Sequence, residues 1–118
     1  MERLFALSRL LDGYGALLTE RQRSIMRQYC DENLTLAEIA ERENISRQGV
    51  RDAISRGEQQ LKGMEAAIGL IKKQDLQEHE LRTLALRLQD ARLSEEANAI
   101  LNDGFQRLRE IWEDEDGI

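Results

Sequence analysis

Hydrophobic residues recur at steps of three and four along nearly the whole chain, which is the spacing of one face of an α-helix. The first such stripe consists of Leu4, Leu7, Leu11, Tyr14 and Leu18. A stripe of this kind is typical of a helix that packs on one side. The chain has 118 residues and no proline, and 34% of its residues are charged, a composition typical of helices. We therefore predict an all-α protein.

A capping box predicts the start of the second helix. Thr19 and Gln22 have the spacing at which each side chain satisfies a free backbone N–H of the other residue. The helix should run from there to about Cys30 and be followed by a loop at residues 31–33. Its inward residues should be Ile25, Met26 and Tyr29.

Residues 36–56 have the pattern of two short helices joined by a tight corner, which is that of a helix-turn-helix. Thr35 and Glu38 form a second capping box, so the first of these helices should begin directly after Thr35. Asn44 suits the left-handed backbone of the corner, and Ser46 should cap the next helix. That helix should turn inward Val50, Ala53 and Ile54.

The outward residues near the start of this second helix have side chains that read DNA bases. They are Arg47, Gln48, Arg51, Asp52 and Ser55. In the major groove, arginine donates two hydrogen bonds to guanine, glutamine pairs with adenine, and aspartate accepts from cytosine. The expected contacts to DNA phosphates are Arg21, Arg23, Thr35, Ser46 and Arg56. The alternative is that these residues form an ordinary solvated surface.

The apolar stripe continues beyond the helix-turn-helix in steps of four and three. It consists of Val50, Ile54, Gly57, Leu61, Met64, Ile68 and Ile71. A regular seam of this kind needs a partner helix, either from the C-terminal part of the chain or from a second subunit, and we favour a homodimer. Asp75 is a plausible cap for the next helix, and Ser94 should begin the last one.

These elements predict a helix-turn-helix, a long connecting helix and a C-terminal helical hairpin. The expected division is a helical domain at residues 1–62 and an acidic helical extension at residues 63–118. The net charge is −6, and it arises in the C-terminal half, where residues 64–118 carry seven positive and thirteen negative side chains. Residues 19–63 carry eight side chains of each sign. The part of the DNA affinity that does not depend on the DNA sequence should therefore be low.

The sequence offers no candidate for catalysis, cofactor binding or metal binding. Cys30 is the only cysteine and is expected to be a buried hydrophobic residue, while His79 is the only histidine and has no companion at ligand spacing. Charged residues interrupt the apolar run at the N-terminus, so we expect neither a signal peptide nor membrane insertion. The expected compartment is a reducing cytoplasm.

Two segments together resemble the bacterial YlxM family of helix-turn-helix proteins, namely LLDGYGALLTERQR at residues 10–23 and LTLAEIAERENISRQGVRDAISRGEQQL at residues 34–61. The resemblance covers about the first 60 residues, and the helix-turn-helix is similar to region four of bacterial sigma factors. It implies DNA contacts at Arg47, Gln48, Arg51 and Asp52. Glu43 departs from the pattern, because such motifs often have an apolar residue there, and it should weaken the packing of the corner.

The resemblance also implies a role linked to the signal recognition particle, because genes of the family commonly neighbour those of the particle. The expected function is that of a non-enzymatic, DNA-binding regulatory protein associated with this pathway. The alternative is an adaptor that binds no DNA and docks on the protein or RNA of the particle through its helical surface and acidic tail.

Overall fold

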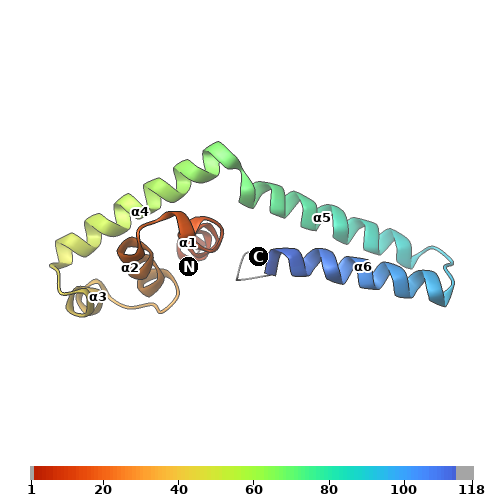
Figure 1. Ribbon diagram of the computed structural model, residues 1–118, viewed down its shortest axis with the longest axis horizontal. Helices are drawn as coiled ribbons and strands as arrows, with labels where there is room; N and C mark the ends of the chain where they lie inside the picture. Colours follow the sequence, from red (N-terminus) through yellow and green to blue (C-terminus); the bar gives the residue numbers. More distant parts are fainter. Residues whose placement is uncertain (1, 114–118) are drawn as a thin grey trace. The chain divides into compact units, whose positions relative to one another are not determined.

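A computed structural model describes residues 2–113, and the described residues form helices joined by short loops (Figure 1). The elements are α1 (Glu2–Tyr14), the 3-10 helix η1 (Gly15–Leu17), α2 (Glu20–Cys30), α3 (Leu36–Glu43), α4 (Arg47–Ile68), α5 (Leu70–Gln89) and α6 (Glu95–Glu113). The chain divides into two compact units between Gln74 and Asp75. This division lies further along the chain than the expected boundary after residue 62.

The first unit is a bundle in which α4 packs against α1, α2 and α3. Its core contains the residues that the periodicity predicts to point inward, with Leu7, Leu11, Ile25, Ile39 and Val50 almost completely buried. Each helix therefore contributes the apolar stripe that its sequence pattern predicts. The prediction of an all-α helix-turn-helix protein is confirmed.

The helix starts of the first unit are fixed by side-chain caps. Thr19 and Thr35 each form a complete capping box, with Gln22 and Glu38 respectively, and the Ser46 hydroxyl accepts a hydrogen bond from the backbone N–H of Gly49 at 2.9 Å. These three caps confirm the helix starts predicted from the sequence. At the corner between α3 and α4, Asn44 has the left-handed conformation, with φ of 56°.

The expectation for the apolar seam of α4 is wrong in its choice of partner. Val50, Ile54, Gly57 and Leu61 are buried in the first unit, where α4 packs on α1, α2 and α3. The first part of the seam therefore needs neither the C-terminal hairpin nor a second subunit. Sequence periodicity identifies the buried stripe of a helix but does not say which helix covers it.

A glycine ends α4, and a buried tyrosine helps to begin α5. Gly69 has φ of 70°, a left-handed conformation that terminates the helix. The Tyr14 hydroxyl donates to the Glu65 carboxylate at 2.6 Å and accepts from the backbone N–H of Leu70 at 2.9 Å. The same carboxylate accepts from the next two backbone N–H groups, those of Ile71 and Lys72.

Asp75 is not a helix cap, because α5 begins at Leu70 and Asp75 lies inside it. The free N–H groups in the first turn of α5 are satisfied by Tyr14, which is remote in the sequence, and by Glu65, which lies in the preceding helix. The part of the cap that Tyr14 supplies leaves no local sequence signal.

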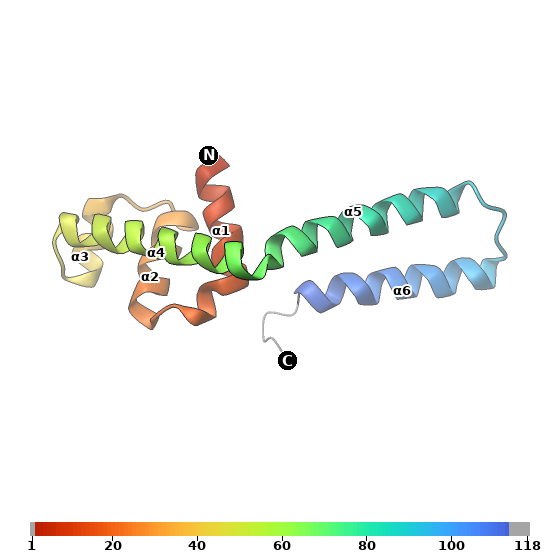
Figure 2. The same cartoon turned by 90° about the horizontal axis from the view of Figure 1, so that it is seen from above.

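In the second unit, α5 and α6 run antiparallel as a helical hairpin (Figure 2). The Ser94 hydroxyl accepts from the backbone N–H of Ala97 at 3.1 Å, which confirms the predicted start of α6. Among the side chains that the structure describes between residues 75 and 113, none is buried. No helix within the described range is both long enough and apolar enough to cross a lipid bilayer.

Candidate nucleic-acid interface

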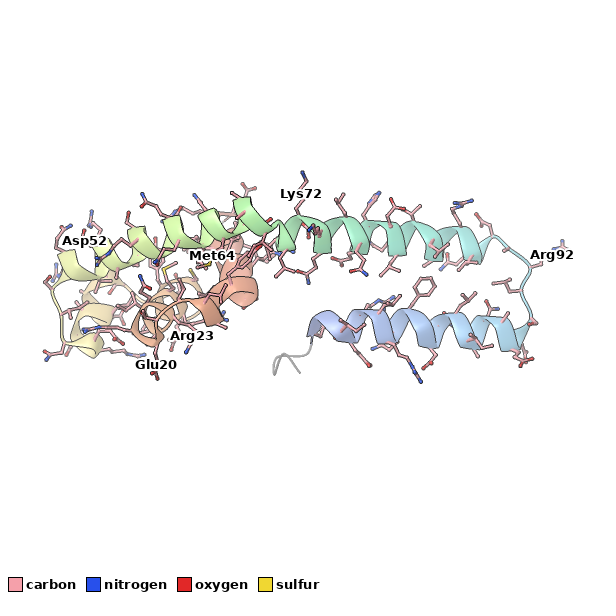
Figure 3. The ribbon with its side chains drawn as sticks, turned by 45° about the horizontal axis from the view of Figure 1, so that its top comes forward. Glu20, Arg23, Asp52, Met64, Lys72 and Arg92 are labelled. Carbon is pink, nitrogen blue, oxygen red and sulfur yellow. The ribbon has the colours of Figure 1, made fainter. Side chains whose placement is uncertain are left out.

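The N-terminal turns of α4 form the exposed face of the helix-turn-helix. Val50, Ala53 and Ile54 are buried against the other helices of the unit, as the sequence predicts. With this side of α4 covered, the opposite side must face outward. Figure 3 shows Asp52 on that outer side.

All five residues expected to read bases are exposed on α4. They are Arg47, Gln48, Arg51, Asp52 and Ser55. Gln48 donates to the Asp52 carboxylate at 3.0 Å, so these two side chains support each other across one helical turn. By contrast, Arg47 and Arg51 have no hydrogen bond or ion pair with any other described residue. Their guanidinium groups are available to an external acceptor.

Two of the expected phosphate contacts already have partners within the protein. Arg21 donates to the backbone carbonyl of Glu43 at 3.0 Å, and Arg23 donates to that of Gly15 at 3.4 Å. Arg21 therefore ties α2 to the end of α3, and Arg23 ties α2 to the start of η1. The other expected contacts are the capping residues Thr35 and Ser46 and the exposed Arg56.

A polar network holds the corner of the helix-turn-helix, so Glu43 does not leave it loosely packed as the departure from the family pattern led us to expect. The Glu43 carboxylate accepts from the Gln28 amide at 2.9 Å and from the Ser24 hydroxyl at 3.3 Å. Arg21 approaches it at 3.9 Å. The polar side chain thus fastens the end of α3 to α2. Gln28 is buried on α2. Because it is polar, the apolar periodicity of the sequence does not predict that it points inward.

The surroundings of two titratable side chains in the first unit shift their pKa values. The pKa of Glu38 is lowered because its carboxylate accepts hydrogen bonds from Thr35 in the capping box. Burial raises the pKa of the Cys30 thiol to about 11, so this half-buried cysteine is protonated at neutral pH. Within residues 2–113, no group of three or more histidine, cysteine or acidic side chains could hold a metal ion.

The bundle, the capped corner and the exposed start of α4 define an all-helical protein of the helix-turn-helix class. Residues 1–101 match the model of a family described as "Putative helix-turn-helix protein, YlxM / p13 like", and the chain belongs to this family. The expected family is thereby confirmed. The match extends well beyond the 60 residues that the resemblance in the sequence covers, and it includes α5 and the start of α6.

The chain is similar to several curated bacterial relatives named UPF0122 protein. It is 47% identical to the one from Clostridium botulinum over 73 residues, which are 62% of this chain and 67% of the relative. It is 48% identical to the one from Acetivibrio thermocellus over 73 residues, which are 62% of each chain. The relative from Desulforamulus reducens is 44% identical with the same coverage. The chain thus spans about two thirds or less of the length of these relatives.

Proposed function

We propose that the protein is a DNA-binding regulator and that the first turns of α4 enter the major groove. The observation that carries this proposal is the pair of partnerless guanidinium groups on Arg47 and Arg51, one helical turn apart at the start of a firmly capped helix. Arginine at this place in a helix-turn-helix can donate two hydrogen bonds to guanine. Gln48 and Asp52 add an amide and a carboxylate to the same face.

The charge balance supports selective binding over general attraction to DNA. Residues 19–63 carry eight positive and eight negative side chains, so few phosphates can be neutralised without a matched sequence. Complementarity at base edges would then have to supply much of the affinity. The resemblance to the YlxM family supports a link between the regulated process and the signal recognition particle, and the likeness to region four of sigma factors supports a role at promoter DNA.

Substitution of the two arginines tests this function. Arg47→Ala or Arg51→Ala should each cost about 1–3 kcal/mol in binding to a selected duplex and relax the base preference. The duplex is selected from fragments of the source genome, and binding is measured by titration. Arg82→Ala is the matched control, because Arg82 is an exposed arginine of α5 outside the first unit. Equal binding by wild type and by the double variant Arg47→Ala/Arg51→Ala would contradict the major-groove proposal.

A second candidate function is that of an adaptor, favoured by the acidic surface of the hairpin. Residues 75–113 carry nine negative and five positive side chains. Such a surface attracts a basic partner and repels a DNA backbone. In this role the hairpin would dock on the protein component of the signal recognition particle or on a complex that contains its RNA, and the helix-turn-helix would serve as a scaffold.

We also propose that the hairpin joins two copies of the chain in a homodimer. Because none of the side chains that the structure describes at residues 75–113 is buried, the helical pair has a small apolar core, and a second hairpin could complete it as a four-helix bundle. A dimer of helix-turn-helix proteins suits a DNA site with two related halves. The adaptor and the dimer use different surfaces of the hairpin, one acidic and one apolar.

A further inference from the structure

Arg3 is a cation of the first helix that the fold brings to the side of α4. Its guanidinium donates to the Glu58 carboxylate at 2.6 Å and to the Tyr29 hydroxyl at 2.7 Å. It also lies over the Tyr29 ring, 5.6 Å from the ring centre, in a cation–π contact. Although 53% of the side chain is exposed, these contacts fix its position. An arginine held in this way loses little conformational entropy when it binds a ligand.

Arg3 lines a pocket together with Arg51 of the recognition helix. The pocket has a volume of about 280 Å³, and its wall also includes Ser55 and the apolar side chains of Leu36 and Ile54. This is slightly below the range of about 300–1,000 Å³ that is usual for sites of whole small molecules. The side chains of Arg51 and Ser55 have no hydrogen-bond partner among the described residues. Two guanidinium groups and one hydroxyl therefore border a space suited to a single anionic group.

The local charge is positive even though the chain is acidic as a whole. Glu58 is the one acidic side chain of the pocket wall, and it is shared between Arg3 and Lys62, whose ammonium lies 2.7 Å from its other oxygen. Hydrogen bonds from Lys62 and Arg3 lower the pKa of Glu58, so it stays ionised at neutral pH. Two cations, Arg3 and Lys62, thus pair with this one carboxylate, and Arg51 adds a third positive charge to the pocket wall. A second anion would still be attracted.

We propose that this pocket takes one phosphate of the DNA backbone, held by Arg3, Arg51 and Ser55. This inference rests on the proposed DNA-binding function and adds a contact residue from outside the helix-turn-helix. Arg51 lies between the pocket and the base-reading face, and its five N–H donors allow it to bind a phosphate and a base edge together. Arg3 anchors the backbone on the α1 side of the recognition helix, and Glu58 positions Arg3.

Titrations of the selected duplex, and of a mixed-sequence duplex for comparison, at several salt concentrations test the proposal. Arg3→Ala should weaken binding about threefold to tenfold on every sequence and reduce the slope of log K against log salt by about one. Arg3→Lys should keep most of the salt dependence, because it retains the charge. The matched control is Arg27→Ala, which removes the same charge and a comparable set of ion pairs, those with Asp12 and Asp31. It should bind DNA as wild type does.

A second variant separates the attraction of the pocket from the stability of the fold. Glu58→Gln keeps an oxygen that can accept from Arg3 and removes the negative charge, so it should bind the duplex more tightly and with a steeper salt dependence. Helical circular dichroism establishes that each variant is folded.

If Arg3→Ala binds with wild-type affinity and slope while Arg47→Ala is impaired, the phosphate pocket is refuted and the proposed function stands. If wild type binds no duplex at any salt concentration, both fail. Equal or weaker binding by folded Glu58→Gln also contradicts the pocket.

Discussion

Gln28 and Glu43 show how one polar pair can hold the corner of a DNA-binding motif. The Gln28 amide nitrogen donates to Glu43 at 2.9 Å and to Ser24 at 3.2 Å, whereas its buried amide oxygen has no partner. An unpaired buried acceptor is costly. The pair therefore combines one strong charge-assisted hydrogen bond with one unpaired buried oxygen. Its net contribution to the free energy of unfolding should be small. The role of the pair is to hold the C-terminal end of α3 in position against α2.

A double-mutant cycle on this pair measures that coupling. Glu43→Leu alone should destabilise the protein by about 1–3 kcal/mol, because it leaves the buried Gln28 amide with only Ser24 as partner. Gln28→Met alone should have a similar cost, since it removes a donor from the carboxylate. The double variant should recover much of the loss, because two apolar side chains can pack where two polar ones met. Urea unfolding gives the three values. Strict additivity would show that the two side chains are not coupled.

At the scale of elements, close approach between α2 and α4 depends on a glycine. A Cβ atom at Gly57 would lie 2.9 Å from the Sδ atom of Met26, which is completely buried. The two helices therefore pack with almost no space between them at this point. Gly63, further along the same helix, has no neighbouring atom within 4 Å of such a Cβ. The two glycines have the same helix propensity, but Gly57 is tightly packed and Gly63 is open.

Alanine at these two glycines should have different effects on stability. Gly63→Ala should stabilise the protein by about 0.5–1 kcal/mol, because alanine favours the helix and nothing opposes its methyl group. Gly57→Ala should lose this gain through its clash with Met26, and Gly57→Val should be destabilising by about 1–3 kcal/mol or more. Thermal unfolding of the full chain compares the three variants. Equal stabilisation by both alanines would mean that α2 and α4 separate without cost at Gly57.

The same elements show which parts of the fold the sequence predicts. Local signals succeed, since the capping boxes at Thr19 and Thr35 and the Ser46 cap place three helix starts correctly. Contacts between distant residues are missed, because neither the cap of α5 by Tyr14 nor the bonds of Arg3 to α4 leave a pattern in nearby residues. For the candidate site, the sequence identifies exposed side chains on α4 but cannot reveal which arginines already have partners.

At the scale of the whole molecule, the two units differ in how much apolar surface they cover. The first unit has a well-buried core, whereas none of the described side chains at residues 75–113 is buried. Exposed apolar side chains on the hairpin include Leu84, Ile100 and Ile111, which are 45%, 65% and 67% exposed. Large apolar side chains gathered on one exposed surface commonly mark an interaction site.

Helical geometry places these three residues on one side of the hairpin. Successive residues of an α-helix are rotated by about 100°, so each of the three lies beside the inward stripe of its own helix. In an antiparallel pair, the side that carries Leu84 on α5 is also the side that carries Ile100 and Ile111 on α6. The opposite side carries Glu78 on α5 and Asn102 on α6, and the exposed Leu86 of α5 also lies toward it. The apolar side chains of both helices therefore come together on the Leu84 side, where a second hairpin could make contact.

The last prediction concerns the mass of the protein in solution. If the hairpin is the dimer contact, light scattering of the full chain should give twice the chain mass of 13.6 kDa. Ile100→Asp should then give a monomer, because the dimer would bury an unpaired carboxylate. Asn102→Asp adds the same charge on the polar side of α6 and should leave the mass unchanged. A monomeric wild type would contradict the dimer. If such a monomer bound the purified signal recognition particle protein, and lost that binding when residues 94–118 were removed from an otherwise folded chain, the hairpin would instead be the docking surface of an adaptor.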